Sequence, residues 1–338
     1  MAAVAVDAMG GDRAPFAIVE GAVRATKEFG LEVILVGDES VLDKELKKFS
    51  FPSELLKIHH ATQIVGMDES PSEALRKKPD SSIRVAFNLV RKGKASAVVS
   101  AGNSGATLAS AMVTVGRICG VRPAIATVMP TLKNPVILID VGANVDCKPH
   151  HLLQFGIMGA AFSKEAIGNK SPRVGLLSIG EENTKGNQQV KKAFDLLTKS
   201  SLNFVGNVEG RDVFKGDVDV VVCDGFVGNV SLKLSEGLAE SILLMLKKEI
   251  QHSSFVTKIG YLLARSAFKR FRRLIDYSEY GGAPLLGIKG IGIICHGRSG
   301  ASAICNAIKV ADALVKADFV KHLESCMQQE VSLASIAL

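Results

Sequence analysis

The chain of 338 residues is 47% hydrophobic and 22% charged, a composition typical of a globular protein with a sizeable core. Aromatic residues make up only 5% and tryptophan is absent, so Val, Ile, Leu and Ala are expected to fill the core, as in sheets buried on both faces. The formal net charge of +7 favours an acidic protein, an anionic ligand, an anionic membrane or nucleic acid as partner, and composition alone excludes none of these.

The six cysteines include no Cys-x-x-Cys pair, and most of them lie in apolar runs. This pattern favours buried free thiols in a reducing cytoplasm over a disulfide framework. The first residues lack the basic stretch and apolar run of a signal peptide. The longest uncharged stretch, 95–116, contains Ser, Asn, Thr and Gly, which favours a strand, a loop and a helix over a membrane span.

Strand signals and helical patterns alternate from the N-terminus onward. A strand at 3–6 precedes a helical pattern that ends at Gly30, and a strand at 31–37 precedes a charged helix from about Val41 to Lys48. Five further strands are expected in SAVVSAG, PVILIDVG, RVGLLSIG, NFVGNV and DVVVCDG. The alternation predicts one α/β domain over residues 1–338, a three-layer α/β/α sandwich with a mainly parallel sheet.

Five expected strands end in loops of small residues, Asn and acids: DAMGGD, SAGNSGA, DVGANVD, SIGEENTKGN and CDGFVGN. Such residues are common in any turn between a strand and a helix. However, ligands of parallel sheets bind at the carboxyl ends of strands. Five loops of this kind therefore predict a shared polar site on one rim of the sheet.

The SAGNSGA loop has the features of an anion site. Its glycines allow close approach of the backbone to a ligand, and a helix is expected to start near Ser104, so N–H groups of residues 103–106 would point at the ligand. Neither a G-x-G-x-x-G fingerprint nor a Walker lysine motif occurs. A small phosphate or an acyl phosphate suits these loops better than a dinucleotide.

Three single residues could act in such a site. Lys185 could place positive charge on phosphate or an oxyanion, or be an ordinary surface lysine. Asn229 could donate to a carbonyl oxygen, or be the N-cap of the helix that follows. His296 follows a strand-like run and could be catalytic or structural. The group Cys147, His150 and His151 resembles a metal site, but no second ligand cluster accompanies it, so no metal is expected.

The opening loop carries two acids around a Gly-Gly pair. Asp7 and Asp12 could orient cationic or amide groups in the crevice, while Gly10 and Gly11 let the loop pack closely there. Alternatively, Asp7 ends a strand and Asp12 caps the next helix.

Together the motifs VAVDAMGGDRAP, SAGNSGA, DVGANVDCKP, SPRVGLLSIGEENTKGN, VVVCDGFVGNVSLK, EYGGAPLLGI and HGRS resemble the bacterial phosphate acyltransferases of phospholipid synthesis, the PlsX family. The resemblance covers roughly residues 4–315 and occurs in order along the chain. It implies conversion of long-chain acyl-[acyl carrier protein] and inorganic phosphate to acyl phosphate and free carrier protein, without a cofactor. It also implies a homodimer, a fold similar to isocitrate dehydrogenase and phosphate acetyltransferase, and a peripheral position on the cytoplasmic face of the membrane.

With that resemblance, Lys185 and Asn229 are expected to be catalytic. The residues expected to bind phosphate or the acyl substrate are Asp7, Gly10, Gly11, Asp12, Gly102, Asn103, Ser104, Gly105, Asn144, Asp146, Gly186, Asn187, Asp224, Gly225 and His296. Phosphate is already an anion and a thioester is already activated, so positioning and oxyanion stabilisation suffice. We therefore expect direct attack by phosphate, without an acyl-enzyme.

A helical segment is expected at 230–277, protruding from the domain. On a helical wheel, 258–275 has an apolar face and a basic face. Such a helix suits an anionic membrane surface, but also acidic carrier protein or a second copy of the chain. The residues expected to make this contact are Arg265, Lys269, Arg272, Arg273, Phe268 and Phe271.

Two other classes of function fit parts of the sequence. One is a dehydrogenase on an isocitrate dehydrogenase-like fold, which needs no G-x-G-x-x-G motif. The other is a non-catalytic membrane adaptor, against which the loops argue because an adaptor has little need of them. Nucleic acid is not expected as a partner.

Overall fold

The structure is a computed structural model that describes residues 3–275 and 281–336, with the side chains of 272–275 and 331–336 outside the description. The strands are β1 (Val4–Asp7), β2 (Val33–Gly37), β3 (Leu56–His60), β4 (Ala97–Ser100), β5 (Ala124–Met129), β6 (Val136–Ile139), β7 (Val174–Leu177), β8 (Phe204–Val208), β9 (Val220–Val222), β10 (Ala283–Leu286) and β11 (Ile291–Ile294). Within the described ranges they form one 11-stranded sheet in the order β3-β2-β1-β4-β11-β10-β5-β6-β9-β7-β8.

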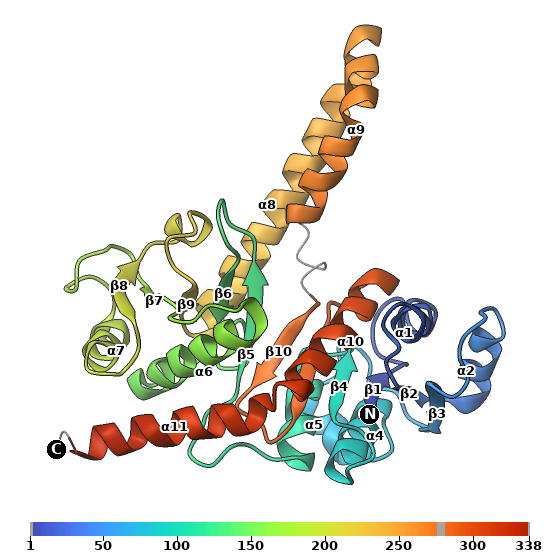
Figure 1. The fold of residues 1–338 in the computed structure, drawn as a ribbon, viewed down its shortest axis with the longest axis horizontal. Helices are drawn as coiled ribbons and strands as arrows, with labels where there is room; N and C mark the ends of the chain where they lie inside the picture. Colours follow the sequence, from blue (N-terminus) through green and yellow to red (C-terminus); the bar gives the residue numbers. More distant parts are fainter. Residues whose placement is uncertain (1–2, 276–280, 337–338) are drawn as a thin grey trace.

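Helices cover both faces of the sheet (Figure 1). They are α1 (Phe16–Phe29), α2 (Glu39–Leu46), α3 (Pro71–Lys77), α4 (Ser82–Arg91), α5 (Ser104–Thr114), α6 (Pro149–Ile167), α7 (Gln188–Thr198), α8 (Gly225–His252), α9 (Phe255–Ile275), α10 (Ala301–Lys316) and α11 (Phe319–Ile336). One core lies beneath α1, α6, α7, α10 and α11, and the other beneath α4 and α5. Because alternate strand residues enter opposite cores, the three-layer α/β/α prediction is confirmed.

The boundaries of the first elements follow from local chemistry. Helix α1 ends as expected at Gly30, whose φ of 65° suits a left-handed C-cap. Helix α5 starts at Ser104 because the side chain of Asn103 accepts a hydrogen bond from the Ala106 N–H at 3.0 Å. The alternative in which Asp12 caps α1 is wrong, since the N-cap is Pro15 and has no side-chain cap bond.

The sheet reverses direction near its middle. Strand β10 is antiparallel to both β11 and β5, and β5 is antiparallel to β6. The remaining pairings are parallel. As a result, β1, β2, β3, β4 and β11 run one way and β6, β7, β8 and β9 run the other way. Their carboxyl ends lie at opposite edges, so the expectation of five loops on one rim is wrong.

Helices α8 and α9 form a hairpin that projects away from the sheet (Figure 1). The helical segment expected from residue 230 starts five residues earlier, at Gly225, because Asp224 accepts from the Val227 N–H at 2.8 Å and caps α8. Asn229 therefore lies inside the helix and is not its N-cap. Residues 276–277 of the expected segment are outside the described residues. In the described part of the chain, no helix is both long and apolar enough to cross a bilayer.

The start of α8 packs tightly on the loop after β6. A Cβ atom added to Gly228 would lie 1.8 Å from the carbonyl oxygen of Asp140, closer than any atomic contact allows. By contrast, nothing lies within 4 Å of a Cβ added to Gly237, farther along the same helix. Only the first turns of α8 therefore depend on glycine.

We expect Gly228→Ala to lower the free energy of unfolding by about 3 kcal/mol or more, because the helix must move away from Asp140. The matched control, Gly237→Ala, should leave stability unchanged or raise it by up to about 1 kcal/mol, because alanine favours a helix over glycine. Urea denaturation followed by circular dichroism measures both. Equal stability of the two variants would contradict the packing described here.

Candidate functional site

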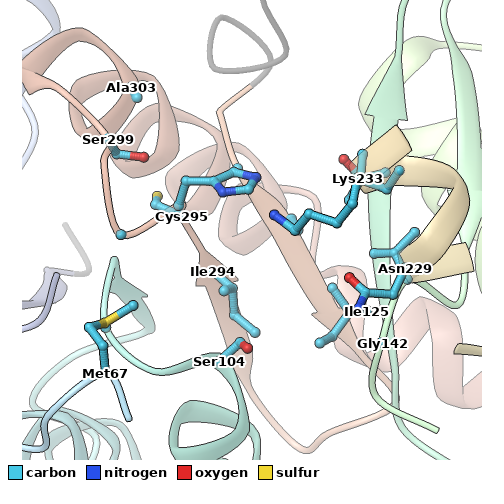
Figure 2. Close-up of a pocket in the computed structure, with 18 residues that line it drawn as sticks. Met67, Ser104, Ile125, Gly142, Asn229, Lys233, Ile294, Cys295, Ser299 and Ala303 are labelled. Carbon is cyan, nitrogen blue, oxygen red and sulfur yellow. The ribbon is translucent and has the colours of Figure 1, made fainter. Parts of the chain in front are cut away.

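The first candidate site is a cavity of about 300 Å³ at the junction of the two strand directions. Strands β5, β10 and β11 form its floor through Ile125, Thr127, Ala283 and Ile294. Helix α8 covers one side with Asn229, Leu232 and Lys233 (Figure 2). The opposite side is formed by Met67, by Gly102 and Ser104 before and in α5, and by residues 295–303. Loops from both parts of the sheet thus meet in this first cavity.

Two long helices begin at the wall of the first cavity. Ser104 is the first residue of α5, and Ser299 and Ala303 flank the start of α10. The N–H groups of a helix's first turn lack partners within the helix and attract anions. The SAGNSGA loop thus lies at the cavity wall through Gly102 and Ser104, and the Ala106 N–H in its helix is occupied by the Asn103 side chain.

Asn103 has a structural role. Its side chain caps α5 and donates to the carbonyl oxygens of Met67 and Glu69, at 2.7 and 3.0 Å. These bonds hold the 67–69 segment against the first cavity. Gly105 lies close to Pro71, because an added Cβ would approach the ring to 2.7 Å.

The opening loop lies behind the first cavity and does not line it in the part of the chain described. Asp7 is buried and accepts from the Ser100 hydroxyl at 2.7 Å. Burial raises the pKa of Asp7, although hydrogen bonds from Ser82 and Ser100 oppose that effect. Gly10 packs so closely on Asp7 and Gly102 that a Cβ would lie 2.4 Å from the carboxylate. Asp7 thereby joins the loops after β1 and β4.

Gly11 and Asp12 connect this loop to the segment after β11. Gly11 has a φ of 104°, and a Cβ there would lie 3.2 Å from the Gly297 carbonyl oxygen. The Asp12 N–H donates to the same oxygen at 2.8 Å. Since Gly297 lines the first cavity, these residues support its wall from behind.

A second buried carboxylate, Asp140, organises the DVGANVD loop. It is fully buried, and it accepts hydrogen bonds from the N–H groups of Ile125, Ala143 and Asn144, at 2.9, 3.1 and 2.7 Å. Burial raises the pKa of Asp140, and those hydrogen bonds counteract the rise. This residue is absent from the site expected from the sequence, although its place at the end of an apolar strand was a signal.

Two predicted residues of the same loop, Asn144 and Asp146, differ in burial. Asn144 is buried, and its amide donates to the Pro123 carbonyl at 2.8 Å and to Asp140 at 2.9 Å. Arg122 donates to the Asn144 side-chain oxygen, and the Gly225 N–H donates to its backbone oxygen at 2.7 Å. Asp146 is exposed to solvent. The loop's contribution to the first cavity is Val141 and Gly142.

The SIGEENTKGN loop borders a different cavity. Lys185 is exposed, and its neighbours Gly186 and Asn187 line a second cavity of about 310 Å³ together with Asp224. Asn187 also caps α7, accepting from the Val190 N–H at 2.9 Å. The structure therefore does not bring Lys185 into the first cavity with Asn229.

The first turns of α8 separate the two cavities. Asp224 and Val227 line the second one, and Asn229 and Lys233 line the first. Most side chains around the second cavity are apolar, and they belong to Leu152, Leu176, Leu177, Ile179, Val190 and Val227.

Three ionisable side chains gather at the first cavity. His296 lines it, and its Nε2 lies 2.9 Å from Glu236 Oε1. The Lys233 ammonium donates to Glu236 Oε2 at 3.2 Å. Burial alone would raise the pKa of Glu236, but His296 and Lys233 hold it below its usual value. Lys233 and Glu236 are missing from the site expected from the sequence. The spacing of four residues between Asn229 and Lys233, which places these two side chains on one face of a helix, was a signal for Lys233.

Cys295 is the one thiol among the described residues that line the first cavity. Burial raises the pKa of this thiol to about 12. It therefore stays protonated near neutral pH, and a protonated thiol is a poor nucleophile.

The residues expected to contact a membrane or carrier protein lie on α9. Arg265, Lys269 and Phe271 are exposed, whereas Phe268 is half-buried against Tyr261 with ring centroids 5.1 Å apart. Arg272 and Arg273 belong to α9, but their side chains are outside the described residues.

In the described parts of the chain, no cluster of three or more His, Cys, Asp or Glu side chains could hold a metal ion.

None of the described residues that line the first cavity is acidic, while Lys233 and His296 can both carry positive charge. With two helix N-termini in its wall, the cavity favours a small anion. The exposed amide of Asn229 can donate to a carbonyl oxygen beside that anion. Such a site suits transfer of an acyl group to or from phosphate.

Proteins of similar fold include phosphotransacetylases. The structure resembles a phosphotransacetylase from Streptococcus pyogenes with a TM-score of 0.64, 17% identity and coverage of 94% of both chains. A second match is the EutD phosphotransacetylase from Staphylococcus aureus, with a TM-score of 0.59, 17% identity and coverage of 93% of this chain and 94% of that one. At this identity the likeness establishes the fold alone.

Sequence comparison goes further. The model of the fatty acid synthesis protein family matches residues 2–322. A phosphate acyltransferase of Syntrophotalea carbinolica is 59% identical over 309 residues, which is 91% of this chain and 89% of the relative. One of Nitratidesulfovibrio vulgaris is 57% identical over 315 residues, covering 93% and 91%. These relatives favour acyl transfer over the dehydrogenase alternative. The chain therefore belongs to the fatty acid synthesis protein family and is an acyltransferase enzyme of its phosphate acyltransferase group.

Proposed function

We propose that the enzyme transfers the acyl group of a long-chain acyl-[acyl carrier protein] to inorganic phosphate, giving acyl phosphate and free carrier protein for phospholipid synthesis. The observation that carries this proposal is the first cavity, which has basic side chains and two helix N-termini but no acidic side chain among its described lining residues. The names of the relatives, phosphate acyltransferase, support phosphate as one substrate.

The reaction balances without an oxidant or a cofactor. A phosphate oxygen attacks the thioester carbonyl carbon, and the carbonyl electrons move onto its oxygen. When that oxyanion collapses, the C–S bond breaks and the carrier protein's thiolate leaves and takes up a proton. Holding both reactants together can lower the barrier by about 7–11 kcal/mol, so no strong base is required.

Asn229 is well suited to stabilise the oxyanion. It lies in the first cavity beside Gly142, where a Cβ would approach the Asn229 side chain to 3.7 Å. A Cβ at this distance would be in ordinary contact, so it is the φ of 133° at Gly142, not the amide, that favours glycine there. Lys185 stays a predicted catalytic residue, and from its exposed turn it would have to act around the start of α8.

Asn229→Ala should lower kcat by about 10²–10³-fold, the usual effect of losing one oxyanion donor. The assay follows release of free carrier protein from palmitoyl-[acyl carrier protein] with and without phosphate. Lys185→Ala, measured in parallel, tests whether this lysine contributes to the same step. If Asn229→Ala kept wild-type kcat, its proposed role would be excluded.

Cys295→Ala should keep most of the activity, because a thiol protonated at neutral pH does not attack the thioester. Mass spectrometry of enzyme quenched during turnover should find no acyl adduct. A covalently acylated enzyme, or loss of activity in a Cys295→Ala variant that stays folded, would refute direct attack.

We also propose that the α8–α9 hairpin contacts an anionic membrane surface peripherally. Near its tip, four large apolar side chains are strongly exposed: Phe255, Val256, Leu262 and Leu263. Exposed basic residues lie on the same helix, among them Lys258, Arg265 and Lys269. Apolar insertion and basic attraction together are typical of interfacial helices.

Along α8, an exposed stripe of Leu234, Leu238, Ile242 and Met245 suits a second copy of the chain, in line with the expected homodimer.

Charge reversal at Arg265, Lys269 and Arg273 should abolish binding to anionic vesicles in a sedimentation assay, since each basic residue contributes about 1 kcal/mol near such a surface. Control variants with reversed Lys27 and Lys44, exposed on α1 and α2, should still bind. If the first set kept vesicle binding and raised only the KM for acyl carrier protein, the hairpin would bind carrier protein instead.

A further inference from the structure

The first cavity contains a lysine whose position suggests a specific task. Lys233 lies one helical turn after Asn229, and both side chains line the cavity. Figure 2 shows them extending from α8 toward the side formed by Cys295 and Ser299. The cation and the amide therefore lie side by side on one helix face.

Glu236 connects Lys233 on α8 to the loop after β11. Its two carboxylate oxygens contact two partners, Lys233 from the same helix at 3.2 Å and His296 from the loop after β11 at 2.9 Å. The Glu236 side chain is only 14% exposed, so solvent screens these contacts less than it screens a surface pair. Exposed ion pairs within one helix usually contribute little to stability. Glu236 differs from such a pair because it also contacts His296 in the loop after β11.

The lysine still has capacity for a ligand. An ammonium group has three N–H donors, and the contact to Glu236 is a single bond of moderate length. The Lys233 side chain is 55% exposed. Across the cavity, α10 starts at Ala301, and the N–H groups of its first turn have no partner within the helix, whereas the Ser299 N–H before it donates to the His296 carbonyl oxygen at 2.9 Å. An anion between Lys233 and this helix start would meet a positive group on each side.

We propose that Lys233 is the cation that binds the phosphate substrate, and that Glu236 is a positioning residue that fixes Lys233 and His296 at the mouth of the same site. This inference rests on the proposed function and deepens it, because it assigns the phosphate to the first cavity beside Asn229. In this assignment the first turns of α8 lie between the bound phosphate and the exposed Lys185.

Binding of inorganic phosphate alone tests the inference without any acyl donor. In isothermal titration calorimetry, Lys233→Met should weaken phosphate binding by about tenfold or more, as expected for loss of a charged hydrogen bond. Lys233→Arg should recover part of the affinity. Lys44→Met, the same substitution on the exposed α2, should bind as the wild type does. Wild-type affinity in Lys233→Met would overturn the assignment.

Steady-state kinetics then separate positioning from a merely structural role. Glu236→Gln should raise the KM for phosphate while the KM for acyl-[acyl carrier protein] and the melting temperature stay near wild type. If both KM values rose together, or if phosphate KM did not change, the positioning role would be rejected. If wild-type enzyme bound phosphate through Lys233 but showed no phosphate-dependent release of carrier protein, the proposed function would fail while the binding site stood.

Discussion

The buried carboxylate of Asp140 is the group on which the arrangement of the first cavity depends. Taking a carboxylate out of water is costly, and here four backbone N–H groups and one side-chain amide donate hydrogen bonds that offset the cost. Those donors belong to the start of β5 and to the loop after β6. The Asp140 carbonyl oxygen also lies directly against Gly228. One residue thus fixes two strands and the first turns of α8, the helix that carries Asn229 and Lys233.

A comparable carboxylate lies in the other half of the sheet. Asp7 ends β1 and receives the Ser100 hydroxyl at the end of β4, so it joins two glycine-rich loops just as Asp140 joins its neighbours. The antiparallel strand β10 connects the halves. Because the strand direction reverses there, the first cavity lies over β5, β10 and β11 between two sets of loops and not along one edge.

Several residues that the sequence suggests as substrate ligands have structural roles in the fold. Asn103, Asn187 and Asp224 are helix N-caps, and Asn144 is buried in a network around Asp140. The same polar residue types serve capping and ligand binding, since both require a donor or acceptor at a helix start. Spacing in the chain cannot separate the two uses. The Lys233–Glu236–His296 contact joins residues 60 positions apart, which no local pattern reveals.

The α/β/α layers, the places of the early strands and helices, and the family can all be inferred from the amino-acid sequence. Apolar periodicity and turn residues are local properties, and the motif order along the chain is a property of the sequence alone. Which loops share a cavity, by contrast, depends on how the chain packs in three dimensions. That outcome depends on the reversal of the sheet at β10 and on the entry of α8 against Asp140, and both are set by packing between segments far apart in the chain. For this reason Asn229 and Lys233 lie in the first cavity, while Lys185 lies beside the second.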